Sequence, residues 1–216
     1  MTHSSIRDAA TIILVRRSGD GVKVLMGQRS ARATFMPNAF VFPGGAIEPR
    51  DASAQFDTPL NPICRARLRR APAEVTPEIL AAAAIRELHE ETGLALGTRH
   101  TTGDETQHID IHGNAGAMTY FFRALTPPER PQRFDARFFL AFSDALDGDI
   151  DDFSQSDLEL SHLSWLSIDD ARALDLPLIT DMVLAELAHF LSAPAPIDSV
   201  PFFHLGSDKN GFSRLV

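Results

Sequence analysis

The segment from Thr76 to Gly93 constrains the fold more than any other part of the chain, because it carries a complete set of helix signals. The Thr76 hydroxyl can cap the helix, Pro77 suits the first turn, and Glu78 places negative charge near the positive end of the helix dipole. The alanine-rich run that follows favours helix strongly, and Gly93 is a typical residue at a helix end. We therefore predict one long central helix.

Three acidic side chains, Glu87, Glu90 and Glu91, share one face of this helix, because residues three and four positions apart are neighbours. Carboxylates crowded in this way repel one another unless a cation neutralises them. Oxygen ligands suit Mg²⁺ or Mn²⁺, which also bind phosphate oxygens. An isolated acidic cluster is more often a solvated helix face, so the interpretation depends on the surrounding residues.

The surrounding residues match the Nudix box, which is written G-x5-E-x7-R-E-U-x-E-E-x-G-U, where U is a bulky aliphatic residue. The second half of the box is present without a departure: Arg86, Glu87, Leu88, Glu90, Glu91, Gly93 and Leu94. The chain therefore resembles the Nudix hydrolases, whose α+β fold is an α/β/α sandwich with a mixed central sheet. The resemblance implies a Mg²⁺- or Mn²⁺-dependent enzyme that cleaves a diphosphate bond.

The first half of the box departs from the pattern and leaves its first glutamate open. Gly45 is the motif glycine, and Glu78 has the E-x7-R spacing to Arg86. However, an irregular insertion over about residues 46–75, broken by several prolines, separates Gly45 from Glu78. Asp51 lies six positions after Gly45, where G-x5-E requires the acid. Either Glu78 or Asp51 can therefore supply the first motif acid.

The resemblance also implies a role for each matched residue. Glu90 and Glu91 would be the main metal ligands, and Glu87 a further ligand or the catalytic base. The backbone carbonyl of Gly45 would complete the metal shell, and Arg86 would orient a glutamate through a salt bridge. The bound ions would bridge the diphosphate and acidify a water molecule that attacks one phosphorus atom.

The segment before the box resembles the coenzyme A diphosphatase signature L-L-T-x-R-S/A-x3-R-x3-G-x3-F-P-G-G. The spacing is kept throughout, and four positions differ: Met26, Gly27, Thr34 and Asn38. The split box is also similar to the subgroup around the peroxisomal coenzyme A diphosphatase of animals. The resemblance implies that coenzyme A or an acyl-CoA is cut into 3′,5′-ADP and (acyl-)4′-phosphopantetheine, with Arg29, Gly44 and Gly45 contacting the substrate. The alternatives are an ADP-ribose or dinucleotide pyrophosphatase and a catalytically silent Nudix-fold protein that binds a ligand.

Two further features each have a plainer alternative. Glu159 lies six positions before Trp165, where many Nudix enzymes have a glutamate that supports the metal or acts as base; the alternative is an exposed strand residue. Four arginines of the insertion could bind the 3′-phosphate of coenzyme A, although a solvated basic face is the favoured interpretation. These arginines are Arg65, Arg67, Arg69 and Arg70.

The remaining pattern places strands before and after the central helix. A hairpin and a short third strand are expected first, over Thr11–Arg16, Val22–Arg29 and Phe40–Phe42. Three later strands are expected over Met118–Leu125, Ala136–Phe142 and Leu158–Leu166. Three shorter helices are expected over Cys64–Arg69, Ser167–Leu174 and Thr180–Leu191. This order predicts a single α+β Nudix domain over residues 1–216, with the insertion and a C-terminal helix and tail over about residues 178–216.

Charge and composition limit the partners. With 29 acidic against 20 basic side chains, and a formal net charge of −9, the chain lacks the basic footprint that nucleic acid needs. Its apolar runs are too short to span a bilayer, its N-terminal segment lacks the apolar centre of a secretory signal, and its single cysteine fits a reducing compartment. We expect a cytoplasmic protein whose partner is a small-molecule diphosphate, with no nucleic acid and no membrane. A homodimer is left open.

Overall fold

The computed structural model describes residues 5–33, 36–70, 75–101, 109–193, 196–204 and 211–216, and only the backbone of residues 99–101 and 109–111. A nine-stranded sheet runs through the molecule in the order β10-β2-β1-β9-β8-β11-β12, with β3 paired to β2 and β4 paired to β1. Its strands are β1 (Ile6–Ser18), β2 (Gly21–Arg29), β3 (Phe40–Val41), β4 (Gly44–Ala46), β8 (Thr119–Leu125), β9 (Arg133–Phe142), β10 (Leu160–Ser167), β11 (Val200–His204) and β12 (Phe212–Leu215).

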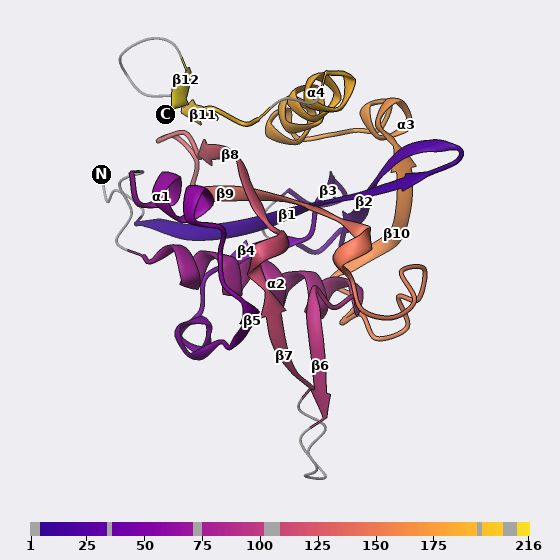
Figure 1. Cartoon of the computed structure of the whole chain (residues 1–216). Helices are drawn as coiled ribbons and strands as arrows, with labels where there is room; N and C mark the ends of the chain where they lie inside the picture. The colour runs from indigo at the N-terminus through magenta and orange to yellow at the C-terminus, as the bar shows by residue number, and fades with distance from the viewer. Residues whose placement is uncertain (1–4, 34–35, 71–74, 102–108, 194–195, 205–210) are drawn as a thin grey trace.

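Helices cover both faces of this sheet, as Figure 1 shows. The long helix α2 (Pro77–Thr92) lies on one face, and α3 (Ile168–Arg172) and α4 (Leu178–Ser192) lie on the other. Within the sheet, β1 runs parallel to β9 and antiparallel to β2 and β4, so the sheet is mixed. The α/β/α layering predicted from the sequence is therefore confirmed.

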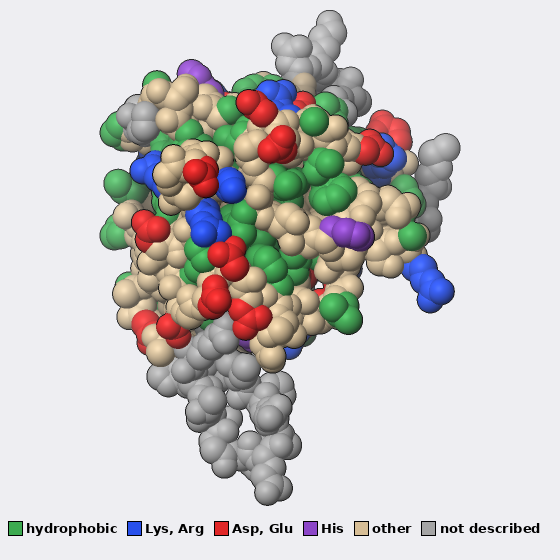
Figure 2. Space-filling model, turned by 90° about the vertical axis from the view of Figure 1, so that its right-hand side faces the viewer, with side chains coloured by type: hydrophobic (Ala, Val, Ile, Leu, Met, Phe, Trp, Pro, Cys, Tyr) green, Lys and Arg blue, Asp and Glu red, His purple; other side chains and the backbone are tan. Residues whose placement is uncertain are grey.

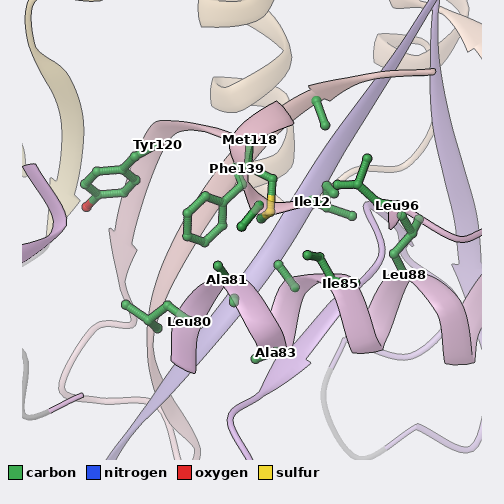
Figure 3. Packing of buried hydrophobic residues seen from close by; sticks show 14 of the residues in the cluster. Ile12, Leu80, Ala81, Ala83, Ile85, Leu88, Leu96, Met118, Tyr120 and Phe139 are labelled. Carbon is green, nitrogen blue, oxygen red and sulfur yellow. The ribbon is translucent and has the colours of Figure 1, made fainter. Parts of the chain in front are cut away.

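The alternation of side chains along β1 explains the two layers. Ile12 and Leu14 belong to the apolar cluster that contains the α2 residues, whereas Ile13 and Val15 belong to the cluster that contains the α4 residues. Successive side chains of a strand point to opposite faces, so the apolar run Ile12–Val15 of β1 contributes to two cores. Figure 3 shows the first core, where the small alanines of α2 let the helix lie close to Ile12, Met118 and Phe139.

The helix α2 forms as its sequence signals predict. The Thr76 hydroxyl accepts a hydrogen bond from the Ile79 N–H at 3.3 Å, and Gly93, with φ of 78°, follows the last helical residue. Ten of its residues are buried, most of them alanine and leucine, and they fix the rotation of the helix about its axis. This rotation turns the acids of the C-terminal half toward β4.

The insertion is more ordered than its prolines suggest. It contains a 3₁₀ helix η1 (Pro49–Ser53), a strand β5 (Phe56–Thr58) and the expected short helix, which is α1 (Pro62–Arg70). The strand β5 joins β7 (Ile109–Asn114) and β6 (Gly97–Thr101) in a second sheet. Two more 3₁₀ helices complete the described elements, η2 (Ala115–Ala117) and η3 (Ser143–Ala145).

The region after α4 adds strands that the sequence did not predict. In place of an irregular tail, β11 pairs in parallel with β8, and β12 pairs with β11, which extends the main sheet by two strands. The strand β10 begins at Leu160, because Leu158 has a left-handed backbone with φ of 66°. In the part of the chain that the structure describes, no helix has both the length and the apolar character needed to cross a membrane.

Candidate active site

The acids of α2 face the glycine-rich segment that forms β4. The Glu91 side chain is buried, with only 1% of the residue exposed, and one of its oxygens accepts a hydrogen bond from the Gly44 N–H at 2.8 Å. The Glu87 carboxylate lies against Gly45 so closely that a Cβ atom at position 45 would overlap it. Glycine at position 45 therefore leaves room for the Glu87 carboxylate in this position, which gives a physical reason for the motif glycine.

The register between β1 and β4 decides which way each peptide group of the glycine pair points. Ala10 is paired with Gly45 and Thr11 with Gly44, and the Ile12 N–H donates to the Pro43 carbonyl. Paired residues of antiparallel strands alternate between hydrogen-bonded and non-hydrogen-bonded, so the polar groups of Gly45 face β1 and those of Gly44 face away from it. The bond from Gly44 to Glu91 agrees with this alternation.

Arg86 binds Asp51 and not Glu78. Its Nε donates to Asp51 Oδ1 at 2.8 Å and its Nη2 to Asp51 Oδ2 at 3.3 Å, and the Asp51 side chain is only 2% exposed. Burial lowers the pKa of Arg86, but the ion pair with Asp51 and the charge of Glu87 outweigh it, so the pKa is raised and the guanidinium stays charged. Glu78 instead forms an ion pair with Arg65 of α1 at 2.6 Å.

Glu90 lies between two arginines. Its Oε2 accepts a hydrogen bond from Arg86 Nη1 at 2.9 Å, and its Oε1 accepts one from Arg50 Nη2 at 2.6 Å. Arg86 also binds Glu87 Oε1 at 2.8 Å. Arg50 belongs to η1 in the insertion, and sequence reasoning missed it, because no motif spacing connects this residue to the central helix.

Glu159 and Arg29, which the sequence suggested separately, form an ion pair at 3.2 Å. They meet because β10 pairs with β2, with Leu160 opposite Arg29. The loop before β10 is also attached to the end of α2, since the Asp157 N–H donates to the Glu90 carbonyl at 2.8 Å. Glu159 is 54% exposed, so its side chain is accessible beside the buried acids.

The electrostatics of this cluster favour the binding of a cation. Burial raises the pKa of Glu91 well above its ordinary value, and the charges of Glu87 and Glu159 raise it further, while the Gly44 N–H and Arg29 lower it. The pKa of Glu87 is also raised, first by burial and then by the charges of Glu90 and Glu159, while Arg86 lowers it. A bound cation would offset both the burial and the mutual repulsion of these carboxylates.

The count of charges points the same way. The cluster contains six carboxylates and three arginines: Glu48, Asp51, Glu87, Glu90, Glu91 and Glu159, with Arg29, Arg50 and Arg86. All of its potential metal ligands are carboxylate oxygens, which are the ligands that Mg²⁺ and Mn²⁺ prefer. Within the described ranges no three acidic, histidine or cysteine side chains already converge on one point, because arginines hold Glu87 and Glu90. The residues therefore fit a divalent cation by charge and chemistry.

Acidic and basic side chains are likewise mixed on the side of the molecule shown in Figure 2.

The arginines of α1 lie away from this cluster. Arg65 contacts Glu78, which is twelve positions before Glu90 on α2, or about 18 Å along a helix that rises 1.5 Å per residue. Arg70 donates to the backbone oxygen of Val216. This placement favours the interpretation of these arginines as a solvated basic helix face. It does not favour their contact with a substrate that is bound at the acids of α2.

Two departures from the coenzyme A diphosphatase signature have a physical reason. Asn38 stands where the signature has glycine, and its φ of 61° is left-handed, a conformation that asparagine tolerates better than most residues. Gly27 stands where the signature has threonine, and a Cβ there would lie 2.8 Å from the Leu160 Cβ. Thr34 lies outside the described residues.

Comparison with known proteins agrees with the fold and the box, although no protein-family model matches the chain. A Caenorhabditis elegans protein named as nudix hydrolase 7 is 28% identical to this chain over 196 residues. The match covers 79% of this chain. The match spans 56% of that relative, so the chain corresponds to little more than half of its length.

Solved structures show the same architecture. A NUDIX hydrolase from Alicyclobacillus acidocaldarius superposes with a TM-score of 0.62 at 25% identity, over 84% of this chain and 90% of that one. The NUDIX domain of Shewanella oneidensis NrtR, solved with ADP ribose, superposes with a TM-score of 0.50 at 13% identity, over 87% of this chain and 90% of that one. The chain therefore has the Nudix fold, and its sequence and structure are similar to those of Nudix hydrolases.

Proposed function

We propose that the chain hydrolyses a diphosphate bond in a nucleoside diphosphate derivative with the help of Mg²⁺ or Mn²⁺. The observation that carries this proposal is the pair formed by Glu87 and Glu91. Glu91 is buried and Glu87 nearly so, both against the glycine pair of β4, and burial together with neighbouring carboxylates raises the pKa of each. Such a pair is costly to bury for structure alone.

The residues that would hold the cation are Glu87, Glu90 and Glu91, with one backbone carbonyl. The strand register supports the carbonyl of Gly44 over that of Gly45, because the Gly44 polar groups point away from β1 toward α2. When bound, the cation would neutralise charge on the diphosphate and lower the pKa of the attacking water.

The remaining roles belong to side chains of the chain itself. Asp51 would be the first acid of the box, since it fixes Arg86, which in turn orients Glu87 and Glu90. Glu159 or Glu87 would accept the proton from the attacking water, and Glu159 has the more accessible carboxylate. Arg29, which forms an ion pair with Glu159, would contact a substrate phosphate.

We propose coenzyme A or an acyl-CoA as the substrate, cleaved to 3′,5′-ADP and (acyl-)4′-phosphopantetheine. The support is the lead-in signature, whose departures at positions 27 and 38 are compatible with its backbone. A turnover screen with Mg²⁺ and Mn²⁺ over coenzyme A, acetyl-CoA, NADH, ADP-ribose and nucleoside triphosphates tests the choice. Efficient turnover of another compound, with coenzyme A compounds untouched, would contradict it.

Glu91→Gln tests the activity itself. The amide oxygen of glutamine can still accept the Gly44 hydrogen bond, so we expect the circular dichroism spectrum to be unchanged and turnover to be lost. Glu186→Gln is the matched control, since Glu186 forms an ion pair with Arg214 on other elements. Near-normal turnover in Glu91→Gln would refute the proposal, and ligand binding without any turnover in the unmodified chain would favour the silent binding protein.

A further inference from the structure

Arg50 is held between two acids at the edge of the candidate site. Its Nε donates to Glu48 Oε2 at 2.7 Å and its Nη2 to Glu90 Oε1 at 2.6 Å, while its side chain is 54% exposed. The 3₁₀ helix η1 fixes the start of this side chain, because the Glu48 N–H donates to Asp51 Oδ2 at 2.6 Å and closes the turn. Arg50 is thus presented to α2 by the same turn that supplies Asp51.

The two arginines that bind Glu90 differ in how firmly they are held. Arg86 is nearly buried and also binds Asp51, Glu87 and the Ala46 carbonyl. The contacts described for Arg50 are Glu90 and the half-exposed Glu48. An exposed ion pair contributes little free energy, so Arg50 can leave Glu90 at small cost, whereas Arg86 cannot.

In the described arrangement both oxygens of Glu90 are occupied by guanidinium groups. Each oxygen of Glu90 therefore already accepts a charge-assisted hydrogen bond, and a cation at this carboxylate would compete with the two guanidinium groups for its charge. The departure of Arg50 would free Oε1 without disturbing the pair between Arg86 and Asp51.

We propose that Arg50 occupies Glu90 in the metal-free protein, yields this carboxylate to a divalent cation, and then binds a phosphate of the substrate. The inference rests on the proposed function, because it assumes that Glu90 is a ligand. The guanidinium of Arg50 lies at the edge of the cluster that would hold the cation and, through it, a substrate phosphate. Its planar fork of donors matches phosphate oxygens better than an ammonium group does.

Cation binding without substrate tests the first half of the proposal. Mn²⁺ binding to the full chain is measured by electron paramagnetic resonance for the unmodified protein, for Arg50→Ala, and for Arg172→Ala as a matched control. Arg172 is similarly exposed and forms an ion pair with Asp181, far along the chain from the acids of α2. We expect Arg50→Ala to bind Mn²⁺ about twofold to fivefold more tightly, the range expected when one exposed competing ion pair is removed, and Arg172→Ala to bind as the unmodified protein does.

A double variant shows whether the effect passes through Glu90. In the Glu90→Gln background, Arg50→Ala should leave Mn²⁺ affinity unchanged, because the contested carboxylate is gone. If Arg50→Ala lowers the melting temperature, Arg50→Lys keeps the charge while losing the fork, and a smaller gain in Mn²⁺ affinity is expected. Unchanged or weaker Mn²⁺ binding in both Arg50 variants would overturn the proposal.

Phosphate binding tests the second half. With saturating Mg²⁺, we expect Arg50→Ala to bind α,β-methylene-ADP, a nucleoside diphosphate that resists hydrolysis, several-fold more weakly by calorimetry. Equal affinity would show that Arg50 does not contact the diphosphate. If the unmodified chain binds no Mn²⁺ at all, the proposed function fails; if it binds Mn²⁺ and the variants match it, only the inference about Arg50 fails.

Discussion

Arg86 distinguishes between two acids that the sequence leaves equivalent. Asp51 accepts two hydrogen bonds from Arg86 and one from the Glu48 backbone, and its side chain is almost completely buried. Glu78 has the spacing of the motif, but its side chain is 34% exposed and pairs with Arg65. The substitutions Asp51→Asn and Glu78→Gln therefore remove one negative charge each, the first from a buried pair and the second from a partly exposed pair.

The burial of each ion pair gives the expected loss of unfolding free energy in the two variants. Removal of one partner from a buried ion pair costs about 3–5 kcal/mol, because the other charge is left uncompensated. Arg86 keeps Glu87 and Glu90, so we expect Asp51→Asn to lie below that range, at about 2 kcal/mol of unfolding free energy. An exposed pair contributes about 0–1 kcal/mol, so Glu78→Gln should change the unfolding free energy very little.

Urea unfolding measures both variants, with the single tryptophan, Trp165, as the fluorescent probe. We also expect Asp51→Asn to lower turnover, since an unfixed Arg86 no longer orients Glu87 and Glu90, while Glu78→Gln keeps turnover close to normal. Asp51→Glu introduces the glutamate that the motif has at this position. It keeps the negative charge and changes only the length of the side chain, so it separates the effect of charge from that of size. The assignment is refuted if Glu78→Gln costs as much stability and turnover as Asp51→Asn.

Three further outcomes follow from close contacts and burial. Gly45→Ala should lose most turnover with little change in melting temperature, because the new Cβ displaces the flexible Glu87 carboxylate and no backbone; full activity would contradict the contact. Gly27→Thr, which restores the signature residue, should lower the unfolding free energy in urea by about 1–3 kcal/mol through overpacking against Leu160, and a stabilised variant would show that the strands adjust freely. Burial raises the pKa of the Cys64 thiol to about 11, so the folded state keeps its proton longer than the unfolded chain. Stability from this group is complete below about pH 9 and is lost as the pH rises toward 11, by at most about 3 kcal/mol. Cys64→Ser should flatten this alkaline loss in urea unfolding followed from pH 8 to 11, and equal slopes for both proteins would count against it.

The central helix and its acids could be predicted because their signals are local. The hydroxyl of Thr76, the alanine run and Gly93 each act on backbone only a few positions away, and the shared face of Glu87 and Glu91 follows from helix geometry alone. The α/β/α layering could be predicted for a related reason, since an apolar strand such as β1 must be covered on both faces.

The contacts that cross the insertion could not be predicted in this way. Arg50 reaches Glu90 across 40 positions, and its partner is decided by how η1 packs on α2, which no periodicity encodes. The strands β11 and β12 also escaped prediction, because a short strand at a sheet edge is determined by its neighbour β8 more than by its own residues.

The split box shows what motif spacing stands for. In the uninterrupted pattern the first acid lies eight positions before the arginine, whereas Asp51 lies 35 positions before Arg86 and still binds it. The free-energy cost of closing a loop grows only slowly with its length, so the added residues weaken this contact little. They also fold into β5 and α1, and α1 packs on α2 near Glu78, away from the acids at the other end of the helix. The spacing of a motif thus reflects a contact between side chains in the folded protein. Asp51 makes this contact with Arg86 without the spacing, whereas Glu78 has the spacing and contacts Arg65 instead.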